Sequence, residues 1–474
     1  MKHVKVSIII PTYRGSDHLG EAIQSVLDQL YPDWELLVVD DCSPDQTSEV
    51  LKQYSDPRIR TIRHEQNLGS DIARNTGLKA STGEIIAFLD QDDLFHPEKL
   101  QAHVAFLDRH PDIGFTYNGR FELNYSSKSV REIWRPPYAI TLQDLVLWFP
   151  LSPSDVMLRR EWALQMDLIG GSRGAEIFHF GRLYLDGCKF GCVDRALNYR
   201  RYHSGRVIKD LTGSCESEIH NQVRIFTDPR CPAEVKALRN IGHANIYQYW
   251  AFLAFAQGET TIGQEFIRNA IRYKPSILKG TPGELVDLLV INCIADENLD
   301  HAAQLQKIFA QFPQEIAWLS QQLEGALAQG YFLKGARATM WDRNEDGNKY
   351  FEEAIRLGFR IDKTLITQLA SKLLDYEAEF GEDSAKKALQ AWTPFVEQSG
   401  GKTSVRGLNG TYAANRAFQN YRMGEFGDIP GTVMRAVASD PKYLMNRGVL
   451  SVLLRSTVGQ WAKNPKVAPG PVPD

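Results

Sequence analysis

The sequence predicts an α/β protein: a mostly parallel sheet flanked by helices, followed by an all-α region. Two observations predict this class. The first ~110 residues alternate between short apolar, β-branched runs and segments with helical spacing, as in parallel sheets covered by helices. Beyond about residue 215, helical periodicity continues to about residue 460. We therefore expect a first domain at 1–215, a helical domain at 216–460 and a Pro-rich, disordered tail at 461–474.

The strands and helices of the first domain can be placed in order. The expected strands are "VKVSIII", "WELLVVD", "IRTIRH" and "EIIAFLD"; the first is a continuous apolar, β-branched run, which is typical of a strand buried on both faces. The segment "SDHLGEAIQSVLDQL" predicts a helix capped by Ser16 or Asp17, with apolar residues at helical spacing: Leu19, Ile23, Val26, Leu27 and Leu30. "TSEVLKQYS", capped by Thr47, "DIARNTGLKAS" and "HPEKLQAHVAFLDRH", opened by Pro97, predict the other helices. Residues 120–205 mix short strands and turns, and end in a strand and a basic loop, "YRRYHSGR".

The helical region contains a weak repeat. The segments "QEFIRNAIRYKP", "NKYFEEAIRLGF" and "GTVMRAVASDPKYL" place Ala270, Ala354 and Ala436 at 84- and 82-residue spacings, each after a helix and a Gly-containing turn. A small residue at such a position lets two helices pack closely. The pattern resembles degenerate tetratricopeptide-like hairpins, and an irregular helical bundle is the alternative.

The bulk properties argue against several classes of protein. The net charge of −4 lacks the basic footprint of a nucleic-acid-binding protein. No apolar stretch approaches the ~20 residues of a membrane helix, and the short run Val6–Ile10 is followed by a proline rather than a cleavage site. We expect a cytoplasmic protein without a transmembrane segment or nucleic-acid partner. Peripheral contact with the inner face of a membrane is compatible with the sequence.

Polar residues gather where three of the expected strands end. The first strand ends in Pro11-Thr12-Tyr13, the second in Asp40-Asp41, and the fourth in Asp90-Gln91-Asp92-Asp93. Ligands of parallel sheets bind beyond these carboxyl ends. Carboxylates suit Mn²⁺ or Mg²⁺, which take one or two protein carboxylates together with substrate phosphates.

Each of these groups also has a purely structural interpretation. The acids of the fourth strand can cap the helix that follows them, and Asp40-Asp41 can build a strand-to-helix turn. Arg74, on the helix between the two acidic ends, can contact a nucleotide or simply pair with neighbouring aspartates.

Four motifs in register resemble the nucleotide-binding half of glycosyltransferase family 2, which has the GT-A fold. They are "PTYRGSDHL", "VVDDCSPDQT", "NLGSDIARNTGLKASTGEIIAFLDQDD" and "HPEKL", within about residues 4–110. The resemblance implies a metal-dependent, inverting transferase with Mn²⁺ or Mg²⁺ as cofactor. It would move a sugar from a nucleotide-sugar, expected to be a UDP-sugar, to a hydroxyl of a glycan, lipid-linked or protein acceptor. Bacterial polysaccharide or glycoconjugate synthesis is the expected setting.

The resemblance also implies roles for individual residues of the donor side. Asp40 and Asp41 would meet the uracil, Arg74 the nucleotide, and Asp90 and Asp92 would flank the ribose and the metal. The full set of implied donor-side residues is Pro11, Tyr13, Asp40, Asp41, Arg74, Asp90 and Arg201 for the nucleotide-sugar, and Asp92, Asp93 and His203 for the metal.

The acceptor side matches the family less closely. Members carry a Glu-Asp pair before an "RLxxxG" motif, and aligning "GGSRGAEIFHFGRLYLDGCKF" on Arg182-Leu183 places Ala175-Glu176 there. Glu176 is therefore the implied catalytic base, although its side chain is one methylene longer than that of Asp; a surface Glu, with His179 as the base, is the alternative. "YRRYHSGR" resembles the family's "YRxHxGS" with one residue inserted, so either Arg200 or Arg201 can be the equivalent arginine.

Two rival functions can be weighed. A nucleotidyltransferase needs a Gly-rich phosphate loop after the first strand, and only Gly15 and Gly20 occur there. The other rival is a catalytically inactive nucleotide-binding or scaffold protein whose helical domain recruits a partner. A homo-oligomer or a protein partner bound through the helical domain fits either function.

Overall fold

The computed structural model describes residues 4–124, 129–148, 151–166, 168, 174–202, 208–297 and 299–459. The chain divides into two compact units, Met1–Ala326 and Leu327–Asp474. The predicted domain boundary at residue 215 lies inside helix α8 (Leu211–Thr227) and stays a prediction. The predicted tail at 461–474 lies outside the described residues.

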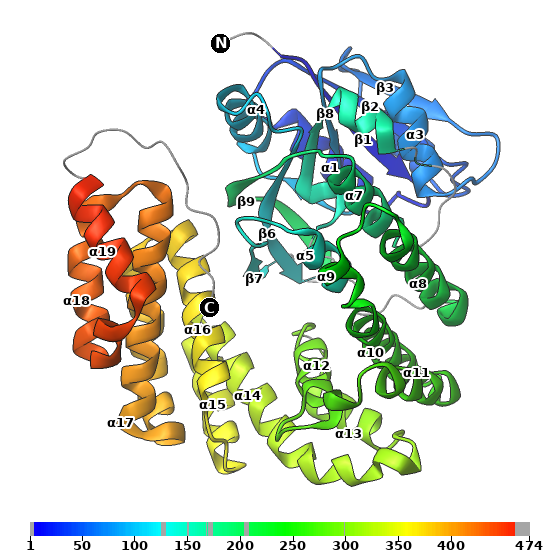
Figure 1. The fold of residues 1–474 in the computed structure, drawn as a ribbon. Coiled ribbons are helices and arrows are strands. Elements are labelled where there is room, and N and C mark those ends of the chain that lie inside the picture. Colours follow the sequence, from blue (N-terminus) through cyan, green and yellow to red (C-terminus); the bar gives the residue numbers. More distant parts are fainter. Residues whose placement is uncertain are drawn as a thin grey trace. The chain divides into compact units, whose positions relative to one another are not determined.

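Within the described residues, nine strands form one mixed sheet (Figure 1). Their order is β3-β2-β1-β4-β8-β6-β9-β5, with β7 paired to β6. The strands β3, β2, β1 and β4 are parallel, and β8 joins antiparallel to both β4 and β6. The strands are β1 Val6–Thr12, β2 Trp34–Asp40, β3 Ile59–Arg63, β4 Ile85–Phe88, β5 Leu94–Phe95, β6 Phe115–Asn124, β7 Val130–Trp134, β8 Val156–Arg159 and β9 Phe190–Tyr202.

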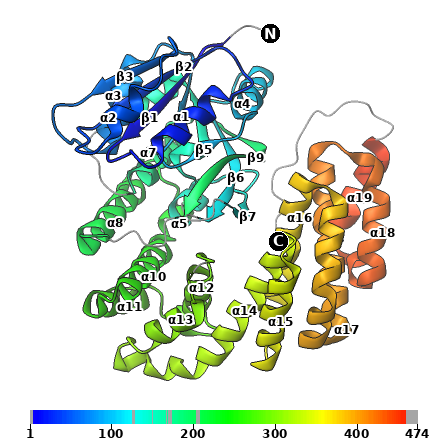
Figure 2. The ribbon, with the colours of Figure 1, turned by 180° about the vertical axis from the view of Figure 1, so that it is seen from behind.

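Helices flank this sheet and predominate among the described residues that follow it (Figures 1 and 2). In the first unit they are α1 Leu19–Leu27, α2 Thr47–Leu51, α3 Ser70–Ala80, α4 Lys99–Arg109, α5 Leu142–Leu147, α6 Arg160–Ala163, α7 Ala175–Leu185, α8, α9 Ala233–Lys236, α10 Arg239–Gln257, α11 Thr260–Tyr273, α12 Glu284–Cys293 and α13 His301–Phe309. They continue with α14 Leu323–Met340, α15 Asn344–Arg356, α16 Lys363–Phe380, α17 Glu382–Met423, α18 Ile429–Ser439 and α19 Arg447–Gly459. The sheet, its flanking helices and the long helical region confirm the predicted fold class. None of the helices in the described ranges is both long and apolar enough to cross a bilayer.

Several predicted details are wrong. Helix α1 ends at Leu27, so Leu30 lies beyond it and is 62% exposed. Its N-cap is His18, without a side-chain cap, rather than Ser16 or Asp17.

Errors also occur at the next helices and at the last strand. Thr47 is the first residue of α2 and not its cap, because its hydroxyl instead bonds Asp45 and the backbone N–H of Gly15. A short strand, β5, precedes α4, which begins at Lys99 rather than near Pro97. Strand β9 extends to Tyr202, so Arg200 and Arg201 lie on a strand and not in a loop.

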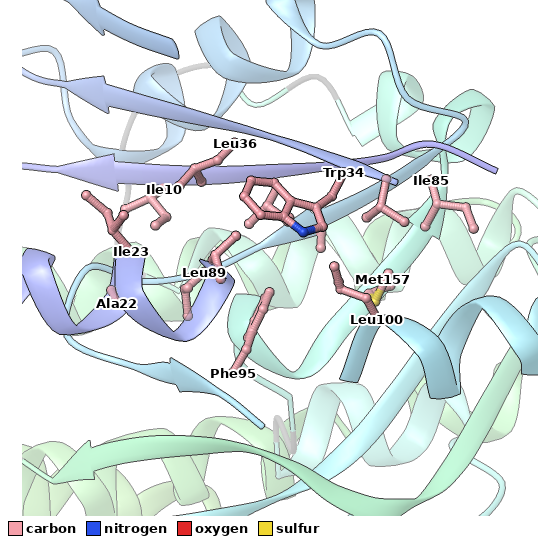
Figure 3. Close-up of a cluster of buried hydrophobic side chains, with 14 of the residues drawn as sticks. Ile10, Ala22, Ile23, Trp34, Leu36, Ile85, Leu89, Phe95, Leu100 and Met157 are labelled. Carbon is pink, nitrogen blue, oxygen red and sulfur yellow. The ribbon is translucent and has the colours of Figure 1, made fainter. Parts of the chain in front are cut away.

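Strands β1, β2 and β4 are buried on both faces, as the continuous apolar run of β1 predicted for that strand, whereas β3 is partly exposed. On one face, α1 and α4 pack on alternate strand residues; Figure 3 shows this cluster, with Ile10, Leu36 and Ile85 from the strands and Ile23 and Leu100 from the helices. On the other face, the intervening strand residues pack against α3 and α7. The members of that second cluster include Ile9, Leu37, Ile86, Leu78, Phe180 and Leu183.

Gly77 sets the distance between α3 and the sheet. A Cβ at this position would lie 2.5 Å from Cγ2 of Ile9, a fully buried, β-branched residue of β1. We expect Gly77→Ala to lower the free energy of unfolding by about 1–3 kcal/mol, because overpacking outweighs the better helix propensity of alanine. Urea unfolding measures this. Gly325→Ala in α14 is the control, since nothing lies within 4 Å of its Cβ; equal effects of the two changes would contradict the packing argument.

Glu35 joins the beginnings of β1 and β2 to the turn before β4. Its carboxylate accepts hydrogen bonds from Ser7 Oγ at 2.6 Å, Thr82 N at 2.6 Å and Thr82 Oγ1 at 2.8 Å. Burial alone would raise the pKa of Glu35, but these bonds and Lys5 outweigh it and lower that pKa from 4.5 to about 2. The bonded carboxylate therefore stabilises the fold above pH 4.5, and this stabilisation is lost as the pH falls toward 2.

Substitution of Glu35 tests this pH dependence. We expect Glu35→Gln to cost most stability above pH 4.5, and the difference from wild type to shrink as the pH falls from 4.5 toward 2. Urea unfolding of both proteins at a series of pH values measures it. A difference that stays constant over this range would contradict the assignment.

The two helices of each predicted repeat are connected by the same kind of turn. In the hairpins α10–α11, α14–α15 and α17–α18, a left-handed residue ends the first helix: Gly258, Asp342 and Gly424. In each case the next backbone N–H bonds to a carbonyl five residues back, as in the Schellman motif, at 2.9, 3.0 and 2.8 Å. Twelve residues after each left-handed residue stands a fully buried alanine, namely Ala270, Ala354 and Ala436. This shared geometry favours repeated hairpins over an irregular bundle.

Candidate active site

The predicted convergence of strand ends is present at the carboxyl edge of β1, β2 and β4. Thr12 and Asp40 are paired in the parallel register, and the N–H of Asp41 donates to the Thr12 carbonyl at 2.8 Å. Gln91 joins the third strand end to the first, because its Oε1 accepts from Thr12 Oγ1 at 2.6 Å and from the Tyr13 N–H at 2.9 Å. Pro11 is buried within β1, whereas Tyr13 is exposed just beyond it.

The chain turns sharply at this edge. Arg14 and Cys42, directly after Tyr13 and Asp41, have φ values of 54° and 62°, which non-glycine residues adopt rarely and often near functional sites. A Cβ at Gly15 would lie 2.2 Å from Thr12 Oγ1. Glycine therefore fits at position 15, where a larger residue would have to displace Thr12.

Asp40 and Asp41 are both buried and are held by protein donors. Asp40 accepts from the backbone N–H of Ser43 at 2.9 Å and forms an ion pair with Arg63. The carboxylate of Asp41 accepts from the backbone N–H groups of Leu68 at 2.9 Å and Gly69 at 2.7 Å, and its Oδ1 lies 2.7 Å from His64 Nδ1. Both thus have the turn-building role considered above, and their contact with a nucleobase stays a prediction.

Arg74 connects three acids from different elements. From α3 its Nη2 donates to Asp90 Oδ1 at 2.7 Å, and its Nη1 donates to Asp71 Oδ1 at 3.0 Å. The same Nη1 lies 3.7 Å from Glu176 Oε1. Burial disfavours the charged guanidinium, but the carboxylates of Asp90, Glu176 and Asp71 outweigh it and raise the pKa of Arg74 above its ordinary value. The cation thus brings an acid of the fourth strand end and the predicted base to the same place.

Glu176 lies in the first turn of α7, where a carboxylate is favoured by the helix dipole. Its side chain is 24% exposed, and that of Asp90 is 30% exposed. Burial raises the pKa of Glu176, and Asp71 adds to this effect, while Arg74 opposes it. His179, the alternative base, is buried and packs edge-on against Phe178. Of the two candidates, Glu176 is the one that solvent can reach.

Helix α8 holds the helix that carries Glu176. At Gly174, the N-cap of α7 with φ 72°, a Cβ would lie 2.5 Å from Cγ of Glu218. At Gly181 it would lie 2.9 Å from Cδ1 of Ile225. The first helix after the sheet therefore packs closely on α7 and fixes the position of the helix that carries Glu176.

The acids of the turn that follows β4, Asp90 to Asp93 (the acidic turn), differ in how deeply they are buried. Asp90 and Asp92 are partly exposed, whereas Asp93 is buried. Burial, together with Asp92 and Asp90, raises the pKa of Asp93 well above its ordinary value. The Asp93 carboxylate accepts from the backbone N–H of Arg201 at 3.3 Å. Asp90 and Asp92 are therefore better placed than Asp93 to reach a ligand.

The chemistry of this turn fits a divalent cation that a ligand helps to bind. Its donors are all carboxylate oxygens, the ligands that Mn²⁺ and Mg²⁺ prefer. Among the residues that the structure describes, no three His, Cys, Asp or Glu side chains form a metal site by themselves, and His203 lies outside those residues. One or two carboxylates completed by phosphate oxygens is the usual arrangement for Mg²⁺.

The two adjacent arginines of β9 point to opposite faces. The side chain of Arg201 is 0% exposed and pairs with Glu21 of α1. That of Arg200 is 44% exposed and lies 3.8 Å from Glu122. Burial would lower the pKa of Arg200, but Glu122, Asp93 and Asp155 raise it above its ordinary value. Of the two, Arg200 is thus the arginine whose side chain solvent can reach.

Some residues of the site were not predicted. Gln91 was visible only as the spacer of the D-Q-D-D motif, and its contacts with β1 have no sequence signature. Asp71, which contacts Arg74, lies within the third matched motif, whereas His64, which contacts Asp41, lies just before it; neither carries a separate pattern. Ser154, whose Oγ accepts from the Asp90 N–H at 3.1 Å, comes from a segment without a recognisable pattern.

Comparison with known protein families identifies the family of the domain that contains the sheet. Residues 7–164 match the model of the family described as glycosyl transferase family 2. This part of the chain is a family 2 glycosyltransferase domain. The matched residues include both acidic strand ends and Arg74, whereas Glu176 and Arg200 lie beyond the match.

Two relatives of this domain are bacterial proteins. TuaG of Bacillus subtilis (strain 168), named for teichuronic acid biosynthesis, is 33% identical over 165 residues, which are 34% of this chain and 65% of that protein. The Escherichia coli protein WfgD, named as a UDP-Glc:α-D-GlcNAc-diphosphoundecaprenol β-1,3-glucosyltransferase, is 38% identical over 141 residues, 30% of this chain and 54% of that protein. The chain thus spans less than two thirds of these relatives.

The structure also has a distant solved neighbour. The S. aureus TarS 1–349 structure in complex with UDP-GlcNAc has a TM-score of 0.41 and 19% identity, over 76% of this chain and 93% of that one. A likeness this distant decides neither fold nor activity.

Proposed function

We propose that the chain is a metal-dependent, inverting glycosyltransferase that moves a sugar from a UDP-sugar to an acceptor hydroxyl. The carrying observation is Arg74, whose guanidinium joins Asp90 of the acidic turn to Glu176 of α7. Donor-side and acceptor-side groups therefore flank one point at the carboxyl edge of the sheet. The names of the relatives support a UDP-sugar donor and an acceptor, glycan or lipid-linked, in bacterial polysaccharide synthesis.

The donor side would work through charge. Asp40 and Asp41 would contact the uracil, and Asp90 and Asp92 would hold the ribose and the cation. When bound, Mn²⁺ or Mg²⁺ would neutralise the charge that develops on the departing diphosphate. The exposed guanidinium of Arg200 offers a second positive charge on this side. We therefore assign the diphosphate contact to Arg200, because Arg201 is enclosed and paired with Glu21.

The acceptor side would work through Glu176. Its carboxylate would take the proton of the acceptor hydroxyl as that oxygen bonds to the anomeric carbon. The bond from that carbon to the diphosphate oxygen breaks at the same time, on the opposite face, so the configuration inverts. The raised pKa of Glu176 suits this role, because general bases work best when their pKa is near the working pH.

Calorimetric titration with UDP, with and without Mn²⁺, tests the proposal at the level of binding. Release of UDP from UDP-glucose and UDP-GlcNAc, in the presence of a lipid extract as acceptor source, tests it at the level of turnover. We expect Mn²⁺-dependent binding, and UDP release that EDTA abolishes. Binding without turnover would favour the inactive nucleotide-binding protein, and absence of UDP binding would refute the donor site.

A further inference from the structure

We propose that Ser154 is a positioning residue that sets the acidic turn, Asp90 to Asp93, for the metal and the nucleotide; this rests on the proposed function. Ser154 is fully buried in the 3-10 turn Pro153–Asp155, directly before β8. Its Oγ accepts from the backbone N–H of Asp90 at 3.1 Å. This hydrogen bond fixes the backbone at the first acid of the turn.

The turn needs such a support because its acids repel one another. Asp90, Asp92 and Asp93 stand within four positions, and Asp93 is buried, so the turn crowds negative charge together. The backbone closes the turn through the Asp93 N–H, which donates to the Asp90 carbonyl at 3.0 Å. Without the Ser154 hydroxyl, the backbone N–H of Asp90 loses its acceptor.

The residue after Ser154, Asp155, anchors this segment to two strands of the sheet. The neighbouring Asp155 is fully buried and accepts from Arg120 Nη1 at 2.7 Å and from the Ser152 N–H at 2.7 Å. It also accepts from Asn198 Nδ2 at 3.0 Å. Arg120 belongs to β6 and Asn198 to β9. Supports of this kind orient ligating carboxylates, and their loss usually weakens metal binding.

The matched pair Ser154→Ala and Ser25→Ala separates positioning from stability. Ser25 is also buried, accepts from the Phe95 N–H at 3.1 Å and donates to the Ala22 carbonyl at 2.7 Å. It thus supports the strand after the same turn with the same kind of hydrogen bonds, but it touches no acid. We expect similar losses in Tm for the two variants. Only Ser154→Ala should lose Mn²⁺-dependent UDP affinity, by about 10- to 100-fold in calorimetry.

Mn²⁺ alone provides a second readout. Electron paramagnetic resonance of the bound fraction should show weaker Mn²⁺ binding in Ser154→Ala and wild-type binding in Ser25→Ala. If both variants bind UDP and Mn²⁺ as the wild type does, or lose affinity equally, the positioning role is refuted while the proposed function stands. If the wild type binds no UDP with Mn²⁺, both fail. If Ser154→Ala does not fold, Ser154→Cys replaces it, and wild-type affinity in that variant overturns the proposal.

Discussion

Glu176→Gln should lower kcat by about 10²- to 10⁴-fold and leave the affinity for UDP unchanged. The amide keeps the size of the side chain but cannot take a proton from the acceptor hydroxyl. The proposed nucleotide contacts at the strand ends do not include Glu176, which lies on α7, so we expect UDP binding to persist without its carboxylate. Steady-state kinetics of UDP release, together with UDP calorimetry, measure the two effects separately.

The pH profile gives a further test of the same base. A general base acts when deprotonated, so the turnover of the wild type should rise with pH through the raised pKa of Glu176. This rise should be absent from Glu176→Gln. Glu98→Gln is the control, because it removes only a surface ion pair with Arg195 and should leave kcat unchanged. Normal turnover of Glu176→Gln would reject Glu176 as the base without rejecting the transferase.

Arg74→Ala should lower the free energy of unfolding by about 3–5 kcal/mol, the cost of leaving buried charges without their partner. The change removes the cation that pairs with Asp71, whose side chain is buried. It also removes the guanidinium that joins Asp90 to Glu176. Chemical denaturation of the purified protein measures the loss.

Arg268→Ala is the matched control for Arg74. Arg268 pairs with Glu315 at 3.1 Å, but both side chains are more than half exposed. Such pairs contribute about 0–1 kcal/mol, so this change should be almost neutral. Arg74→Lys should recover part of the lost stability, because an ammonium restores the charge but not the two-sided donation to Asp71 and Asp90. Equal stability of wild type and Arg74→Ala would contradict the bridging role.

The sheet could be predicted because its signals are local. Runs such as "VKVSIII" and "WELLVVD" alternate with helical segments, and acids placed directly after two of these strands had to meet at one edge. Arg74 was assigned to the site for the same reason, since its helix lies between the two acidic ends. These inferences need only the period of the pattern and the rule that parallel strands end together.

The rest depends on contacts between distant segments. Leu30 continues the helical spacing of α1, yet the chain has already left the helix, and no local rule marks that end. Arg200 and Arg201 are neighbours of the same type, and only the pleat of β9 decides which is exposed. Ser154 meets Asp90 across 64 positions of sequence, through a β4–β8 pairing that a single sequence does not reveal.

The hydrogen bonds of Asp41 have a consequence for the entropy and the rate of nucleotide binding. Two backbone amides and an imidazole already hold its carboxylate, and with it the segment that leads to α3. The conformational freedom of that segment is therefore lost when the chain folds, and not when a nucleotide arrives. A nucleotide that binds here would meet an ordered surface, so its association would carry little entropic penalty from the protein and would need no slow rearrangement of this loop.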